Sequence, residues 1–327
     1  MKKREAPFLI FLFFGITLVL LFAGCTPLEG DFSSVREKAR EKNNWVPNSG
    51  SGLAAQLASL QTNAKTNGSY NIYINADESI KPTVLSYSGR TNISVTLRST
   101  GNEHIISLSS IGSLFTVGSG VTLTLNSNIT LQGRDDNNNS LVHINSGGTL
   151  IMNIGSCITG NKSSTWGGGI YVDGNGTFNL NGGTVSTNVS SAWGGGVFVN
   201  GGTFTMNSGY ISGNSTSSDG GGVYVFDGSF TMNGGIISGN TASGYGEGGG
   251  VYAVSVYTGT EIGTFYITTG TIYGSSEAAS IRNNASWGAA LGGYAQYGTF
   301  SGSTWNSNGY LDSAEDTIRV VNGVLQQ

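Results

Sequence analysis

Apolar residues recur with two different spacings along the chain, and each spacing predicts a different element. Leu53, Leu57, Leu60 and Ala64 fall on one face of a short amphipathic helix, which we place within residues 51–69. Beyond it, residues 70–74 and 93–97 alternate apolar with polar positions and are bounded by Gly, Asn and Ser, which predicts short β-strands. We therefore expect one helix that caps the end of a β-structure.

An internal repeat dominates the rest of the chain. Glycine triplets begin at Gly167, Gly194, Gly220 and Gly248, at intervals of 27, 26 and 28 residues. Each triplet leads into an apolar segment, after which come a Phe-x-x-Asn segment (178–181, 204–207 and 230–233) and a third segment that ends in Asn. A unit of three short strands cannot bury its own apolar face, so neighbouring units must stack.

Stacked units of this kind predict an all-β fold, a single right-handed parallel β-helix over residues 70–327. Fainter copies on both sides of the strong repeats extend it to roughly 9 to 10 coils, which would rise about 4.8 Å each. Strand alternation places the β-branched positions of the first segment and the Phe and Leu or Met positions of the second in the core. The asparagines that end the third segment should lie at turns, in left-handed conformation or bonded to backbone groups: Asn161, Asn188, Asn214 and Asn240.

The composition supports this architecture. The chain of 327 residues has 53 Gly but only 4 Pro, none beyond Pro82, and charged residues make up 10%. The clustered glycines exclude collagen, and the low charge argues against a disordered chain. A long stretch without proline suits a chain built of strands.

The first residues resemble a bacterial lipoprotein signal. Lys2, Lys3 and Arg4 precede an apolar run over 8–23, which ends in Ala-Gly directly before Cys25. The resemblance implies cleavage after residue 24 and a lipidated Cys25, with a tether over 25–50. The alternatives are an ordinary cleaved signal peptide and an uncleaved anchor. Lipidation would place the protein at the cell envelope, in the outer membrane or on the cell surface.

The charge limits the kinds of partner that we expect, and the cysteine content limits the disulfides. Removal of residues 1–24 takes away three bases and one acid, so the formal charge goes from −4 to −6. Lys162 is the only base between Asp135 and Ile281. Nucleic acid is therefore not expected as a partner, since its binding needs Lys and Arg. If Cys25 is lipidated, Cys157 has no partner for an intramolecular disulfide.

The glycine triplet followed by Ile or Val, paired with Phe-x-x-Asn, resembles the repeats of the polymorphic outer-membrane protein family and, more broadly, the pectin-lyase-like superfamily. Those repeats usually carry Gly-Gly-Ala where this chain has a third Gly. The strong copies span residues 150–240. The resemblance implies a β-helical body and a surface-exposed, adhesin-like role.

Many β-helix proteins of that superfamily degrade polysaccharides, so an enzyme is the alternative. Asp219 and Glu247 directly precede glycine triplets and should stack about 5 Å apart, close to the separation of a retaining glycosidase pair. The same two acids could hold calcium. Asp135 and Asp136 are interpreted as part of a polar turn. Two isolated histidines, His104 and His143, are interpreted as ordinary packed or surface residues.

The same alternation turns a column of aromatic residues away from the core, flanked by Trp166 and Trp193: Tyr171, Phe198, Tyr224 and Tyr252. The column is either a ladder that stabilises the sheet or an exposed platform for a glycan or protein partner. Seven extra residues between Tyr252 and Phe265, including Tyr257 and Glu261, are expected to form a rim. The sequence thus favours a binding or structural module of the cell envelope.

Overall fold

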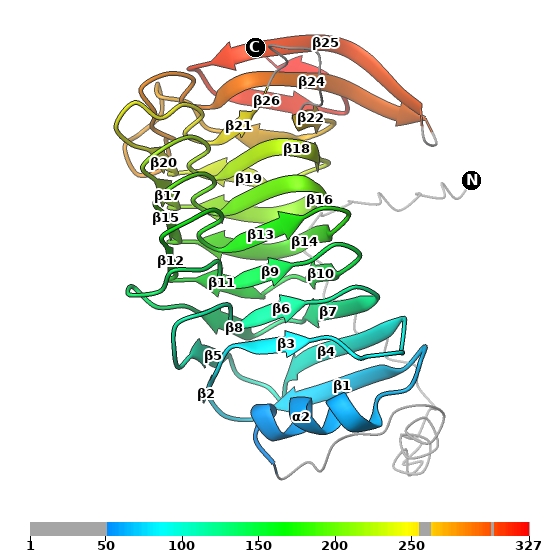
Figure 1. Ribbon diagram of the computed structural model, residues 1–327. Helices are drawn as coiled ribbons and strands as arrows, with labels where there is room; N and C mark the ends of the chain where they lie inside the picture. Colours follow the sequence, from blue (N-terminus) through cyan, green and yellow to red (C-terminus); the bar gives the residue numbers. More distant parts are fainter. Residues whose placement is uncertain (1–50, 255–262, 302–303, 327) are drawn as a thin grey trace, which may run out of the picture. The chain divides into compact units, whose positions relative to one another are not determined.

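The computed structural model describes residues 51–254, 263–301 and 304–326, and these residues form a parallel β-solenoid of about eight turns (Figure 1). Helix content is 4%, and strands of successive coils pair in parallel. Each coil carries three strand positions, here called faces 1, 2 and 3. The predicted all-β parallel β-helix is confirmed.

Face 1 is formed by β3 (Thr83–Leu85), β6 (Phe115–Val117), β9 (Val142–Ile144), β13 (Ile170–Asp173), the first parts of β16 (Val197–Ser212) and β18 (Val223–Met232), β21 (Val251–Ala253) and the start of β24 (Leu291–Ser301). Face 2 is formed by β1 (Ser69–Ile74), β4 (Ile93–Ser99), β7 (Val121–Leu125), β10 (Thr149–Met152), the first part of β14 (Thr177–Ser186), later parts of β16 and β18, and β22 (Gly263–Ile267).

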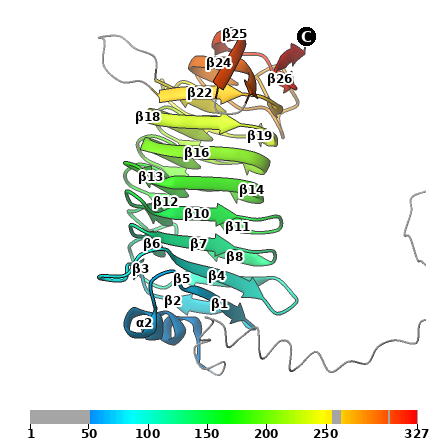
Figure 2. The same ribbon diagram turned by 90° about the vertical axis from the view of Figure 1, so that its right-hand side faces the viewer.

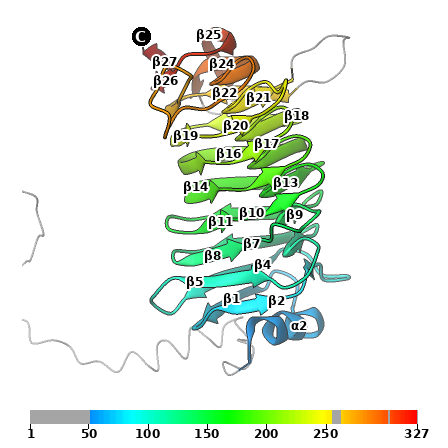
Figure 3. The same cartoon turned by 90° about the vertical axis from the view of Figure 1, so that its left-hand side faces the viewer.

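Face 3 is formed by β2 (Glu78–Ile80), β5 (His104–Leu108), β8 (Ile129–Gln132), β11 (Cys157–Thr159), the ends of β14 and β16, β19 (Ile236–Ser238) and β23 (Gly270–Ile272). A separate four-stranded ladder follows it in the middle coils: β12 (Lys162–Ser163), β15 (Val189–Ser190), β17 (Ser215–Thr216) and β20 (Thr241–Ala242) (Figure 1; β17 and β20 also in Figure 3).

The solenoid has about eight turns rather than the predicted 9 to 10, because the last strands leave the parallel pattern. β25 (Thr304–Ala314) pairs antiparallel with β24. β26 (Ile318–Val321) pairs antiparallel with β23 and with β27 (Val324–Gln326). These hairpins close the C-terminal end of the core instead of adding coils.

The opposite end is covered by helix α2 (Leu53–Asn63), within the predicted range. Leu53, Leu57 and Leu60 are fully buried on its inner face. Glu78 Oε2 accepts a hydrogen bond of 2.7 Å from the Leu53 amide, which satisfies one free N–H of the first turn. At the other end of the helix, the Arg90 guanidinium donates to the carbonyls of Gln61 and Thr62, both at 3.0 Å.

Side chains stack in columns inside the solenoid. Phe178, Phe204, Phe230 and Phe265 are fully buried, and their neighbouring ring centroids lie 4.4–4.6 Å apart. The asparagines that end the third segment of each repeat form a second buried column. The backbone N–H of each one donates to the side-chain oxygen of the asparagine in the next coil, at 2.8–3.2 Å. They bond backbone groups as predicted, but the left-handed conformation belongs to the residues before them: Gly160, Thr187, Gly213 and Gly239.

The glycine triplets let successive coils turn at close distance. The first glycine takes a positive φ, as at Gly194 (+68°), which an L-residue with a side chain rarely adopts. The second glycine of the triplet has no room for a side chain: a Cβ on Gly195 would lie 2.3 Å from the carbonyl oxygen of Gly221 in the next coil. The triplets are therefore structural requirements of the turn between face 3 and face 1.

Candidate functional site: the aromatic surface of face 1

Four aromatic rings on the outer side of face 1 form a continuous stack. Tyr171, Phe198, Tyr224 and Tyr252 pair in register across β13, β16, β18 and β21. Their neighbouring ring centroids lie 5.2–5.3 Å apart. They form a cluster separate from the main core, because strand alternation points them away from it.

Of the two alternatives predicted for this column, a stabilising ladder and an exposed platform, the second does not fit three of its four members. Tyr171, Phe198 and Tyr224 are 8%, 4% and 6% exposed. The covering rings are the two tryptophans: Trp166 lies 6.3 Å from Tyr171 and 6.0 Å from Phe198, and Trp193 lies 5.7 Å from Tyr224. Trp166 and Trp193 themselves stack with planes 6° apart.

The stacking decides which surface a ligand could reach. Ring faces within the column contact neighbouring rings, so they are not open to a sugar ring. Trp166, by contrast, is 44% exposed, and Trp193 is half-buried. The accessible part of the cluster is therefore the outer side of the two tryptophans, and the column beneath them is its support.

The residues before the glycine turns form a column of their own over five successive coils. Backbone hydrogen bonds of 2.9–3.1 Å connect these coils, each from a turn glycine to the carbonyl of the column residue one coil on. The column runs Trp166, Trp193, Asp219, Glu247 and Trp287. Trp287 is 52% exposed. Two acids thus stand between two coils that carry tryptophan on one side and one such coil on the other, and the sequence did not reveal that Trp287 belongs to this column.

Asp219 and Glu247 lie on adjacent coils, as predicted. Asp219 Oδ1 accepts a hydrogen bond of 2.9 Å from the Glu247 backbone N–H. Burial and, second, the neighbouring charge of Asp219 raise the pKa of Glu247. Burial followed by the charge of Asp219 also raises the pKa of Tyr224. Among the described residues, no three His, Cys, Asp or Glu side chains gather as a metal-binding group.

His143 extends the aromatic stack by one coil, which the sequence did not reveal. It pairs with Tyr171 across β9 and β13, and the two rings meet edge to face with centroids 4.6 Å apart. Burial lowers the pKa of His143, and its Nε2 is buried without a hydrogen-bond partner. Its interpretation as a packed residue is confirmed. Alignment of Ile144 with Val172, one coil apart, would have placed His143 next to Tyr171 and so predicted this contact.

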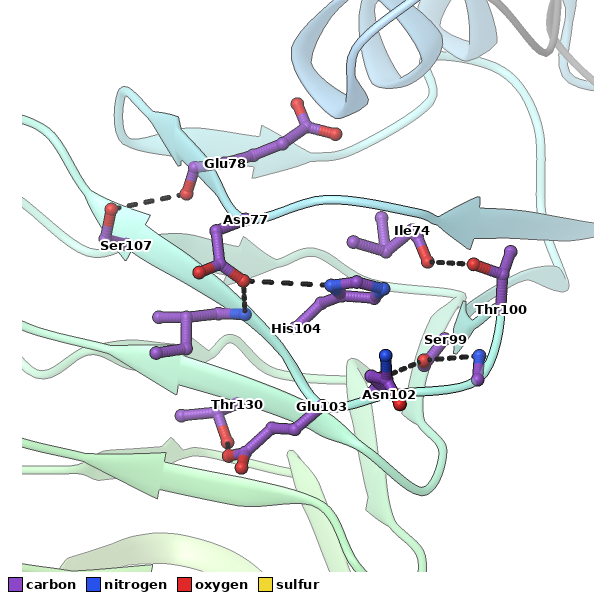
Figure 4. A network of polar contacts seen from close by, with 12 residues as sticks. Ile74, Asp77, Glu78, Ser99, Thr100, Asn102, Glu103, His104, Ser107 and Thr130 are labelled. Atoms are coloured by element: carbon purple, nitrogen blue, oxygen red, sulfur yellow. Dashed lines mark hydrogen bonds and ion pairs between the residues drawn. The ribbon is translucent and has the colours of Figure 1, made fainter.

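Other predicted residues lie elsewhere. Asp135 and Asp136 occupy a turn, where Asp136 forms an ion pair of 2.7 Å with Arg134 that lowers the Asp136 pKa. His104 begins β5, with its Nδ1 3.7 Å from Asp77 Oδ1 (Figure 4). The same Asp77 oxygen accepts the Ile105 amide at 2.8 Å.

Figure 4 also shows Thr130 Oγ1 donating to Glu103 Oε1, at 2.6 Å. These contacts join neighbouring coils of the N-terminal half, so the network stabilises the stacking.

Several predictions fall on residues that the structure does not describe. The signal sequence 1–24, Cys25, the tether 25–50 and the rim residues Tyr257 and Glu261 lie outside the described ranges. Among the helices of the described part, none has the length and hydrophobicity required to span a membrane.

Comparison with known proteins gives no match: no family model fits the sequence, and searches of curated proteins and of solved structures find no similar protein. The parallel β-solenoid is thus established by the structure alone. The resemblance to polymorphic outer-membrane protein repeats, the pectin-lyase-like superfamily and lipoprotein signals stays a prediction.

Proposed function

We propose that the protein is a cell-envelope lipoprotein, anchored through lipidated Cys25, whose β-helical body is an adhesin-like or structural binding module for a glycan or protein partner. The observation that carries the binding role is the outer side of the aromatic cluster. Trp166 keeps 44% of its surface exposed, and Trp193, which stacks on it, is half-buried. Exposed apolar groups of this kind mark interaction sites, and tryptophan is enriched among residues that dominate binding energy.

A glycan array and a screen of envelope and extracellular-matrix proteins test this role. Trp166→Ala combined with Trp193→Ala removes the covering rings and should reduce binding by tenfold or more, about 1.4 kcal/mol. Tyr73→Ala is the matched control, because Tyr73 is a comparably exposed aromatic residue on face 2 of the first coil. Equal binding by all three proteins, or no binding by any, would reject the proposal.

The alternative function is a carbohydrate-active enzyme, either a polysaccharide lyase or a glycoside hydrolase. The observation in its favour is the raised pKa of Glu247 beside Asp219, because perturbed carboxyl groups often occur at catalytic sites. In this reading Glu247 acts as the acid and Asp219 as the second carboxylate. Depolymerisation of acidic or neutral polysaccharides that is abolished by Asp219→Asn and by Glu247→Gln would establish it and replace the binding role.

A further inference from the structure

The outer surface of face 2 carries a regular array of uncharged polar side chains, here called the hydroxyl face. Its first column has a hydroxyl residue in seven successive coils of the described chain: Ser94, Thr122, Thr149, Thr177, Thr203, Ser229 and Thr264. Two residues further along each strand, the second column has threonine in four of these coils, Thr96, Thr124, Thr205 and Thr231, and it has Ile151, Asn179 and Tyr266 in the other three. Figure 2 shows the strands that carry it stacked one above another.

A third column, of asparagines, borders the array, and side-chain hydrogen bonds join it from coil to coil. Each Nδ2 donates to the Oδ1 of the preceding coil at 2.7–3.4 Å, through Asn126, Asn153, Asn181, Asn207 and Asn233. Thr268 Oγ1 closes the series with a bond of 2.9 Å to Asn233 Oδ1. Side chains locked in this way lose little entropy when they bind, which favours a rigid ligand.

Spacing and charge together restrict that ligand. Neighbouring coils repeat at about 4.8 Å, and positions two residues apart on a strand at about 6.6 Å. From β7 to β22, the outward positions of face 2 carry no charged side chain, and Tyr266 is their only aromatic. A polyelectrolyte would find no counter-charge, and a sugar chain would find hardly any ring for stacking.

A neutral, rigid lattice of oxygen atoms suits this surface. On the prism faces of ice, oxygen rows repeat in two perpendicular directions, with one spacing close to the coil repeat and the other somewhat longer than the strand repeat. Threonine suits such a surface, because its hydroxyl both donates and accepts hydrogen bonds while its methyl group fills the space between rows. From these observations we propose that the hydroxyl face binds the surface of ice.

Ice recrystallisation and thermal hysteresis, measured on the purified protein in a cold-stage microscope and a nanolitre osmometer, test this inference. We expect the protein to inhibit recrystallisation. Thr203→Lys, which places a long charged side chain at the centre of the array, should raise the inhibitory concentration by about tenfold. Thr203→Val, which keeps the shape and removes the hydroxyl, should have a smaller effect of the same sign.

Ser212→Lys is the control, because Ser212 is an outward hydroxyl residue of the same strand, β16, as Thr203 but lies on face 3. It should leave inhibition unchanged, and circular dichroism melts verify that all variants stay folded. An inactive wild-type protein, or equal loss in the face 2 and face 3 variants, would overturn the proposal. Binding to crystalline cellulose or chitin that Thr203→Lys abolishes, without any effect on ice, would overturn it in favour of a polysaccharide.

Discussion

Replacement of Asn214 by alanine should destabilise the solenoid severely, because this side chain joins three coils inside the core. Asn214 is completely buried. Its Nδ2 donates to the Val185 carbonyl at 2.9 Å and to Asn240 Oδ1 at 3.0 Å. Its Oδ1 accepts from the backbone N–H and from Nδ2 of Asn188, at 3.0 and 3.1 Å.

The magnitude follows from these four bonds. Alanine would remove these four bonds, while Asn188 Nδ2 would keep its bond to the Ile158 carbonyl and Asn240 Oδ1 its bond from the backbone N–H of residue 214. A buried polar group without a partner costs about 1–3 kcal/mol, but relaxation and entry of water into the vacated space offset part of that sum. We expect a loss of about 3–5 kcal/mol in the free energy of unfolding, a large share of the roughly 5–15 kcal/mol that holds a typical domain.

Urea unfolding followed by circular dichroism measures this loss, with the denaturant slope as a check that the transition is unchanged. Asn207→Ala is the matched control: Asn207 also belongs to an asparagine ladder with bonds of 2.8 and 2.9 Å, but it is exposed on face 2. Water replaces its partners, so its loss should stay below about 1 kcal/mol. Equal losses in the two variants would refute the reasoning that burial makes the inner ladder strong.

Three further predictions concern the turns, the aromatic stack and the anchor. Gly195→Ala places a Cβ 2.3 Å from the Gly221 carbonyl and should cost about 1–3 kcal/mol, seen as a lower Tm; an unchanged Tm would contradict the close approach. Because the pKa of His143 is lowered by folding, the unfolded chain takes up the proton first, and stability should fall as the pH drops below the usual value of 6.5. His143→Phe should reduce this decline in Tm between pH 7.5 and 5.5, and an identical decline would exclude His143 as its source. Cys25→Ser should abolish the incorporation of labelled fatty acid, whereas continued labelling would place the lipid elsewhere.

Much of the aromatic site was predictable, and the errors have identifiable causes. Register from the glycine triplets placed Tyr171, Phe198, Tyr224 and Tyr252 in one column and Asp219 beside Glu247. Exposure was not predictable, because it depends on how far the Trp166 and Trp193 rings lean over the next coil. The segment from Trp287 was predicted as a fainter copy of the repeat, but Trp287 was not placed in the column with Trp166 and Trp193, because its turn reads Gly-Ala-Ala instead of three glycines.

The repeat alone determined the parallel β-helix and its core columns, because a unit of about 27 residues with three alternating strands can bury its apolar side only against copies of itself. Only the tertiary structure determined where the solenoid ends. β26 alternates buried and exposed positions as the earlier strands do, and only its contacts decide between another coil and an antiparallel hairpin. The same holds for the two asparagine ladders, which look alike in sequence and differ in strength because one lies in the core and the other in water.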